Sequence, residues 1–278
     1  MKLSIVESNS LRLDGGAMFG HVPKTVWEKW EAPDSFNRIH LTTRCLLVQT
    51  SEGRNILFEA GIGNFFEPKL MERYGVEPQE NKLLSSLAKI GLSENDIDSV
   101  VLSHLHFDHA GGILSAFGED VPKLFFPKAQ FFVGAKQWEN ALSPHPREKA
   151  SFIPHLQGLL KESGRLKLIE KDSHLDLGKD IHFEFSDGHT LGLMLSWIET
   201  AEGPVIFVSD LIPGRHWIHI PVVMGYDRFG ELKVDEKRSF LERLIQRKNA
   251  RLFFTHDLDV PYVSVAKDDK GNFIWRES

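Results

Sequence analysis

Short apolar runs recur along the chain, each bounded by glycine, aspartate, serine or asparagine. Runs of this length that are rich in valine, leucine and phenylalanine are typical of buried β-strands. We expect strands at residues 46–48, 56–58, 100–102, 131–133, 205–208 and 252–254. Residues 181–186 alternate instead, with Ile181, Phe183 and Phe185 on one face, and this alternation predicts a half-exposed strand.

Apolar residues at helical spacing lie between these runs. The spacing predicts a helix over residues 236–248 with Asp235 as its N-cap, and further helices over about 80–90 and 147–162. Because strands and helices are interspersed, the fold class is α/β or α+β, with helices covering the sheets. No repeat, low-complexity tract or long linker divides the sequence, so we expect a single domain over residues 1–278.

Composition and charge argue against several classes of function. A hydrophobic share of 41% and a charged share of 26% are ordinary for a globular protein. The net charge of −6 gives no basic footprint for nucleic acid. No stretch approaches the roughly 20 apolar residues that cross a bilayer, and early charges leave no room for a signal peptide. We therefore expect a cytoplasmic protein without a nucleic-acid or membrane partner, and its one cysteine, Cys45, is expected to be buried.

The sharpest chemical signal directly follows the expected strand at 100–102. Residues 103–112 read Ser-His-Leu-His-Phe-Asp-His-Ala-Gly-Gly. On an extended segment His104, His106 and Asp108 are two apart and project to the same side, whereas His109 lies where the chain turns. Burying three imidazoles and a carboxylate is costly unless something pairs them. The segment therefore indicates a metal site, with two histidines for one ion and Asp108 and His109 for another.

Three later strands also run into a metal-ligating residue. The strand at 181–186 leads to His189, the run at 205–208 leads to Asp210, and the run at 252–254 leads to His256. Each of these taken alone could be an ordinary loop residue. The same pattern occurs three times, at the strand ends where α/β sheets tend to place their sites, and this recurrence favours ligands.

Residues 103–112 resemble the His-x-His-x-Asp-His signature of the metallo-β-lactamase superfamily, and the later three ligands are similar to its subsequent motifs. The resemblance spans residues from about 40 to 262. It implies an α+β fold, a four-layer αβ/βα sandwich with the metal site at one sheet edge. It also implies one ion held by His104, His106 and His189, a second held by Asp108, His109 and His256, and Asp210 bridging them. The mixed nitrogen and oxygen donors suit two divalent ions, zinc first, with manganese, iron or cobalt as alternatives.

Within the superfamily the chain is most similar to the branch of N-acyl-homoserine lactonases and methyl parathion hydrolase. The similarity lies in residues 13–20, residues 209–213, and His256 with Pro261 downstream. This resemblance implies a hydrolase that uses a hydroxide bridging two ions to open a lactone or cleave an ester, with quorum quenching as the biological setting. The alternatives are a phosphotriesterase or arylesterase on the same scaffold, and a metal-binding protein without turnover.

The sequence also departs from the family pattern at three places, one of them residues 190–193, which read Thr-Leu-Gly-Leu where Thr-Pro-Gly-His is common. Residues 59–61 read Glu-Ala-Gly where the family often has Asp-Thr-Gly, so a contact behind the ligands is expected to differ. Pro213 stands where well-known lactonases carry a tyrosine that assists the substrate carbonyl. His216, His219 and Tyr226 are the candidates for that role.

Catalysis and substrate binding are assigned to nearby side chains. Asp108 is expected to hydrogen-bond the nucleophile and to pass a proton to the leaving group. A small-molecule substrate with an acyl or aromatic group would need an apolar pocket. The candidates for that pocket are Met18, Phe19, Phe65, Phe66, Phe107, His216, Trp217 and Tyr226. The sequence leaves the oligomeric state open, a homodimer included.

Overall fold

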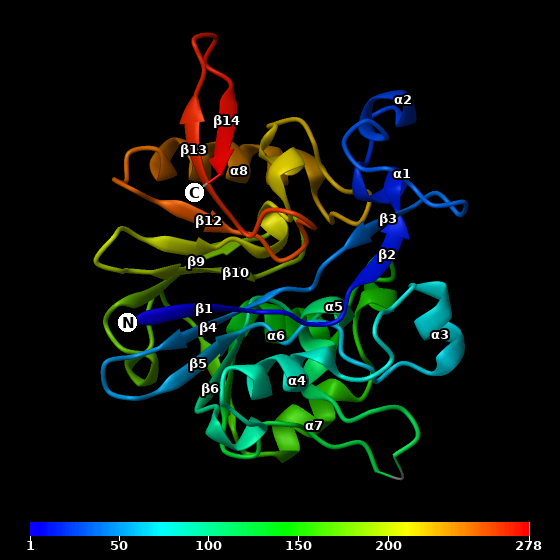
Figure 1. The fold of residues 1–278 in the computed structure, drawn as a ribbon, viewed down its shortest axis with the longest axis vertical. Helices are drawn as coiled ribbons and strands as arrows, with labels where there is room; N and C mark the ends of the chain where they lie inside the picture. Colours follow the sequence, from blue (N-terminus) through cyan, green and yellow to red (C-terminus); the bar gives the residue numbers. More distant parts are fainter. Residues whose placement is uncertain (120, 278) are drawn as a thin grey trace. The chain divides into compact units, whose positions relative to one another are not determined.

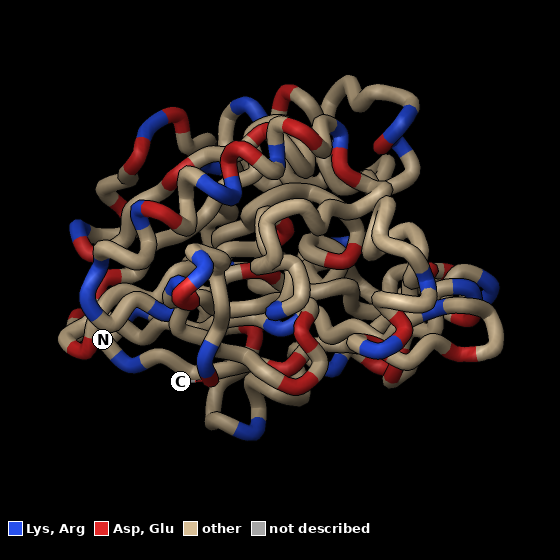
Figure 2. Tube along the Cα trace, turned by 90° about the horizontal axis from the view of Figure 1, so that it is seen from above, with Lys and Arg blue, Asp and Glu red and all other residues tan. Residues whose placement is uncertain are grey.

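The computed structural model describes residues 1–119 and 121–277, which group into two compact units. The first unit comprises Met1–Leu11 and Thr42–Lys171, and the second comprises Arg12–Leu41 and the chain from Asp172 onward. The single-domain expectation stays a prediction. Basic and acidic residues are interspersed along the chain (Figure 2), in keeping with its modest net charge. No helix in the described part of the chain is long and apolar enough to cross a membrane.

The first unit is built on a six-stranded mixed sheet with the order β1-β4-β5-β6-β7-β8. Its strands are β1 (Lys2–Val6), β4 (Cys45–Gln49), β5 (Asn55–Phe58), β6 (Ser99–Leu102), β7 (Gln130–Gly134) and β8 (Leu166–Ile169). Strands β5 to β8 are parallel, whereas β1 and β4 pair antiparallel at one side. The helices of this unit, seen beside its strands in Figure 1, are α3 (Pro68–Arg73), α4 (Lys82–Lys89), α5 (Phe107–Ala110), α6 (Ala135–Leu142) and α7 (Leu156–Glu162).

The second unit is built on another six-stranded sheet with the order β14-β13-β12-β11-β10-β9. Its strands are β9 (Ile181–Ser186), β10 (Leu193–Ile198), β11 (Val205–Phe207), β12 (Arg251–Phe253), β13 (Tyr262–Lys267) and β14 (Phe273–Glu277). The short strands β2 (Leu11–Asp14) and β3 (Arg38–Leu41) form a separate pair, and the helices are α1 (Gly15–Met18), α2 (Lys24–Trp27) and α8 (Gly230–Leu244). Helix α8 packs on the sheet, and the Phe240 ring meets the Trp197 ring edge-to-face at 5.9 Å.

Every strand expected from an apolar run is present, and β9 has the bounds that its alternation predicts. Ile181 and Phe183 are buried as expected, whereas Phe185 is 39% exposed because it lies near the end of an edge strand. Cys45 is fully buried in β4, and this burial raises the pKa of its thiol, with the charge of Glu59 adding to the effect. The core of each sheet is therefore readable from local hydrophobicity.

Two of the expected helix starts are wrong. Helix α8 begins at Gly230, so Asp235 lies inside the helix and does not cap it. The expected helix over 147–162 is interrupted: a short 3₁₀-helix spans Lys149–Ser151 and the α-helix begins only at Leu156, because Pro154 cannot take part in a helix interior. By contrast, α4 matches its expected range, with the Asn81 side chain accepting a hydrogen bond from the backbone at its N-terminus.

Strand direction determines where the chemistry collects in each unit. In the first unit β5 and β6 are parallel, so Glu59 and His104 follow their strands at the same edge of the sheet. In the second unit β9, β11 and β12 all run in one direction, because β10 is antiparallel to both β9 and β11. The residues that follow these three strands, His189, Asp210 and His256, therefore emerge at one sheet edge.

Gly112 gives a test of the packing beneath this edge. A Cβ atom at this position would lie 2.0 Å from the backbone oxygen of Ala60, which cannot move aside. We expect Gly112→Ala to reduce the free energy of unfolding by about 1–3 kcal/mol or more. Gly158→Ala on α7 is the matched control, since no atom lies within 4 Å of its Cβ, and it should be neutral or slightly stabilising. Equal urea midpoints for the two variants would contradict this packing.

Candidate metal centre

The loop after β6 gathers the first group of expected ligands. The rings of His104 and His106 lie 4.5 Å apart, and those of His104 and His109 lie 4.0 Å apart, measured between centroids. Asp108 Oδ2 lies 3.8 Å from His109 Nε2. All four side chains are buried, with Asp108 the most exposed at 8%. The sequence-predicted ligands of the first unit are thus brought together in one buried cluster.

Each histidine of this loop turns one ring nitrogen toward a supporting side chain. His104 Nδ1 is 2.8 Å from Ser103 Oγ, and His109 Nδ1 is 3.5 Å from Glu59 Oε2. His106 Nε2 is 3.7 Å from Glu148 Oε2. The contact of His104 is within hydrogen-bonding distance, whereas those of His106 and His109 are close approaches of an imidazole to a carboxylate. In metal sites, a hydrogen bond from the second nitrogen of a bound histidine to a carboxylate, hydroxyl or carbonyl usually fixes the tautomer and the ring orientation.

Glu59 and Ser209 are held in unusual backbone conformations. Glu59 has φ +67°, and its Oε1 accepts a hydrogen bond from Ser103 N at 2.9 Å. Ser209, directly before Asp210, has φ +43°. Non-glycine residues in the left-handed region cost about 1–3 kcal/mol each and cluster at functional sites. In each unit the chain is therefore bent into a strained conformation next to a candidate ligand.

In the second unit one carboxylate faces two imidazoles. Asp210 Oδ2 lies 3.3 Å from His189 Nε2, and Asp210 Oδ1 lies 3.2 Å from His256 Nε2. These three residues are at most 5% exposed. Each oxygen of the carboxylate is thus paired with a different histidine, as expected of a carboxylate that bridges two ions.

The opposite nitrogen of His189 faces a buried ion pair. His189 Nδ1 lies 2.8 Å from Asp227 Oδ1, and the same oxygen accepts a hydrogen bond from Lys233 Nζ at 2.9 Å. Burial alone would raise the pKa of Asp227, but the charge of Lys233 and the hydrogen bond from His189 outweigh it, so the pKa lies below its usual value. Asp227 therefore supports His189 as an anion, and Nε2 of His189 is directed to Asp210.

The donor spacing fits divalent metal ions. Two donors of one tetrahedral ion with bonds of about 2.0–2.2 Å lie about 3.3–3.6 Å apart, whereas charge-assisted hydrogen bonds are about 2.7–2.9 Å long. The distances from Asp210 to His189 and His256, 3.3 and 3.2 Å, are close to the lower end of the first spacing, and the distance from His189 to Asp227 matches the second. Within the first unit, Glu59, His104 and His109 also have ligand atoms within 4.8 Å of one another. Imidazole and carboxylate donors in this mixture suit zinc.

The residues expected to line the pocket fall into two groups, and their role stays a prediction. In the second unit the Phe19 and Trp217 rings stack at 4.6 Å, and Trp217 Nε1 donates to the Met18 backbone oxygen; all three residues are almost fully buried. In the first unit Phe65, Phe66 and Phe107 form an aromatic cluster together with Tyr74, whose ring lies 5.0 Å from that of Phe107.

Sequence reasoning missed most of the residues that support the ligands. Glu148 and Asp227 lie far along the chain from the histidines that they contact, Lys233 contacts Asp227, and no spacing marks any of the three. Glu59 was noticed only because it replaces an aspartate of the family. From the sequence, Lys233 looks like a solvated helix residue, and only the structure shows its carboxylate partner, Asp227.

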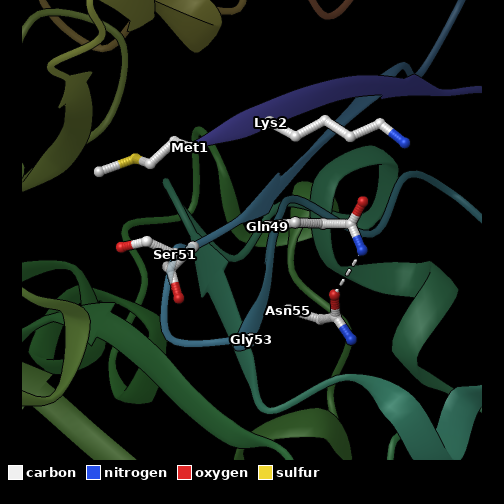
Figure 3. Close-up of a pocket in the computed structure, with 7 residues that line it drawn as sticks. Met1, Lys2, Gln49, Ser51, Gly53 and Asn55 are labelled. Atoms are coloured by element: carbon white, nitrogen blue, oxygen red, sulfur yellow. Dashed lines mark hydrogen bonds between the residues drawn. The ribbon is translucent and has the colours of Figure 1, made fainter.

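A shallow pocket of about 320 Å³ lies elsewhere on the first unit (Figure 3). It is lined by residues at the start of β1, the end of β4 and the start of β5, where Gln49 Nε2 donates to Asn55 Oδ1 at 3.0 Å. This is the amino end of β5, opposite the edge from which Glu59 emerges. Its lining residues include no histidine, cysteine, aspartate or glutamate, so it offers no metal-ligand cluster of these residue types.

Comparison with known proteins identifies the family. The family model described as the metallo-beta-lactamase superfamily matches residues 40–256. Because this match covers more than half of the chain, the protein belongs to the metallo-β-lactamase superfamily. The resemblance seen in the sequence and the prediction of an α+β metallo-β-lactamase fold are confirmed.

Several relatives are hydrolases by name. The N-acyl homoserine lactonase AiiA of Bacillus thuringiensis subsp. kurstaki is 25% identical over 235 residues, which cover 80% of this chain and 83% of AiiA. A probable metal-dependent hydrolase from Staphylococcus aureus is 28% identical with a TM-score of 0.84, covering 100% of this chain and 97% of its own. AidC, a dizinc quorum-quenching lactonase, is 25% identical with a TM-score of 0.77, covering 99% and 94%. The prediction of a metallohydrolase is confirmed.

Proposed function

We propose that this protein is a dinuclear metal-dependent lactonase that opens N-acyl homoserine lactones. The proposed ligands of the two ions are His104, His106, Asp108, His109, His189, Asp210 and His256. The observation that carries the proposal is the Asp210 carboxylate, whose two oxygens each face a different histidine at 3.2 and 3.3 Å. The lactonase names of the relatives support the choice of substrate.

The metal ions and Asp108 have different roles in the proposed hydrolysis. The donor set suits two divalent ions, zinc first. When bound, these ions would supply a hydroxide nucleophile near neutral pH and would polarise the electrophilic oxygen of the substrate. Asp108, at the loop after β6, accepts a hydrogen bond from the nucleophile and passes its proton to the ring oxygen as the ester bond breaks. The product is an N-acyl homoserine, formed from lactone and one water.

We assign to Tyr226 the role of assisting the substrate carbonyl. Pro213, at the position of the tyrosine in well-known lactonases, has no hydroxyl for this role. The His216 ring stacks on the Trp30 ring with centroids 5.6 Å apart, and its Nε2 lies 3.4 Å from Glu31 Oε1. His216 is therefore engaged in contacts with Trp30 and Glu31. Tyr226 is 39% exposed and directly precedes Asp227, which contacts His189. Tyr226 is thus a partly exposed residue on a segment that is anchored to a candidate ligand.

We expect Tyr226→Phe to lower kcat for lactones about 10²-fold, the usual loss for one donor to a developing oxyanion. Steady-state kinetics with elemental analysis of each preparation would measure this, and the metal content should not change. Tyr262→Phe on β13 is the control and should retain full turnover. A wild-type kcat in Tyr226→Phe would remove this residue from the mechanism.

A substrate comparison tests the proposed function. Purified zinc-loaded protein is assayed side by side with N-hexanoyl homoserine lactone and with an aryl phosphotriester, and ring-opened product is measured by mass spectrometry. We expect kcat/KM for the lactone to exceed that for the phosphotriester by about 10²-fold or more, equal to about 2.7 kcal/mol. The reverse order would support the phosphotriesterase alternative. Zinc binding without turnover of either would support a non-catalytic metal-binding protein.

A further inference from the structure

Helix α8 presents three polar side chains to the loops that carry the second unit's candidate ligands. Lys233, Glu236 and Lys237 are three and four residues apart, so they share one face of the helix. Glu236 accepts hydrogen bonds from Asp187 N at 2.9 Å and from Gly188 N at 3.0 Å. The turn that leads into His189 is therefore held against α8 by its backbone.

The approach of this turn to α8 is unusually close. A Cβ atom on Gly188 would lie 2.5 Å from Lys233 Cα, so only glycine allows the contact. The segment just before α8 also binds this turn through its backbone. Phe229 N donates to the Gly188 oxygen at 2.9 Å, and Arg228 N donates to the His189 oxygen at 3.0 Å. The backbone of His189 is thus fixed, and the orientation of its ring is left to the side chains.

Asp227 contacts that ring, and Lys233 contacts Asp227. Asp227 Oδ1 contacts both Lys233 Nζ at 2.9 Å and His189 Nδ1 at 2.8 Å, while Asp227 Oδ2 accepts a hydrogen bond from Met224 N at 2.7 Å. Lys233 is completely buried, and Asp227 is 2% exposed. Buried ion pairs are weak sources of stability, because desolvation offsets their attraction. A contribution to stability is therefore a poor explanation for this buried ion pair. Its contact with a candidate ligand explains it better.

We propose that Lys233 is a positioning residue of the metal centre. Acting through Asp227, it holds the His189 ring with Nδ1–H bonded outward and Nε2 facing Asp210, and so sets the affinity for the ion that His189 holds. This inference rests on the proposed function, since it requires His189 to be a ligand. No contact of Lys233 with substrate is involved.

The matched control lies one helical turn away. Lys237 is as deeply buried as Lys233, but its Nζ donates to three backbone oxygens, those of Trp217, His219 and Val222, at 2.6–3.1 Å. Lys233→Met and Lys237→Met therefore make the same chemical change at the same depth in the same helix. Only the first removes a group that contacts the partner of a candidate ligand.

Two quantities are measured for each variant of the full chain: the zinc dissociation constant, by competition with a chromophoric chelator, and the urea midpoint of the zinc-free protein. We expect Lys233→Met to weaken zinc binding about 10- to 100-fold, the usual effect of removing a group that supports a ligand. Lys237→Met should shift the urea midpoint while keeping the wild-type zinc affinity within about threefold. Equal zinc affinities in the two variants would overturn the proposal.

A second variant covers the case in which Lys233→Met does not fold. Asp227→Asn keeps the shape of the side chain, but its amide can turn an NH₂ group toward His189, which disfavours the tautomer with a proton on Nδ1. We expect a similar 10- to 100-fold loss of zinc affinity and, in ¹H–¹⁵N spectra of zinc-loaded protein, a change in the His189 tautomer. Wild-type affinity with an unchanged tautomer would refute the inference.

The result also separates this inference from the proposed function. If the wild-type protein binds two zinc ions and His189→Ala loses one, unchanged affinity in Lys233→Met and Asp227→Asn overturns the role of Lys233 alone. If the wild-type protein binds no zinc, the metal centre itself is wrong and the positioning role falls with it.

Discussion

Replacing His106 with alanine is expected to remove bound metal and nearly all hydrolysis while leaving the fold intact. The imidazole is a proposed ligand, whereas the bridge that pairs His106 with Phe152 is made by the backbone and survives the change. A metal ion contributes several kcal/mol to the stabilisation of a transition state. Since each 1.36 kcal/mol is tenfold in rate, we expect kcat/KM to fall about 10³-fold or more.

Elemental analysis, circular dichroism and turnover in metal-buffered solution would be measured on the same preparation. His21→Ala removes an exposed imidazole from the second unit and should leave metal content and rate unchanged. Full turnover of His106→Ala at low free metal would contradict the assignment.

Asp210→Asn is expected to have an equally large effect, with a different signature. The substitution preserves the shape of the side chain but removes the charge that faces both His189 and His256. A neutral amide is a poor bridge between two cations, because it cannot offset their mutual repulsion. We therefore expect the metal content to fall from two ions to one or fewer, with a loss of about 10³-fold or more in kcat/KM.

Native mass spectrometry would count the ions in Asp210→Asn directly. Asp235→Asn makes the same change at an exposed position of α8 and should keep two ions and the wild-type rate. Two tightly held ions in Asp210→Asn would show that this carboxylate does not bridge them.

Local sequence was sufficient to predict the strands and to single out the candidate ligands that follow them. The run before His104 and those before Asp210 and His256 are short, apolar and buried, so their hydrophobicity alone marks them as strands. Polar residues directly after a buried strand are conspicuous, because burial without a partner is costly. Both the strand and the candidate ligand are encoded within about ten residues, and this is why the strand could be predicted and the ligand proposed from sequence.

The supports of the ligands could not be predicted in this way. Asp227 lies 38 residues after His189 in the sequence, and its hydrogen bond to the His189 ring depends on how the chain folds back onto α8. Lys233 and Lys237 look like the solvated face of a helix, and the expected start of the helix at residue 236 left Lys233 outside it. Their burial is possible only because Asp227 and the backbone oxygens of residues 217–222 satisfy them, and these partners are tertiary contacts.

Anomalous diffraction at the zinc edge from crystals of the zinc-loaded protein tests the central claim most directly. We predict two peaks about 3.5–4 Å apart, with ligand bonds of about 2.0–2.2 Å and with Asp210 bound to both. Each ion should have ligands from the loop at 104–109 and also from His189 or His256. A single peak, or zinc bound without Asp210, would contradict the account.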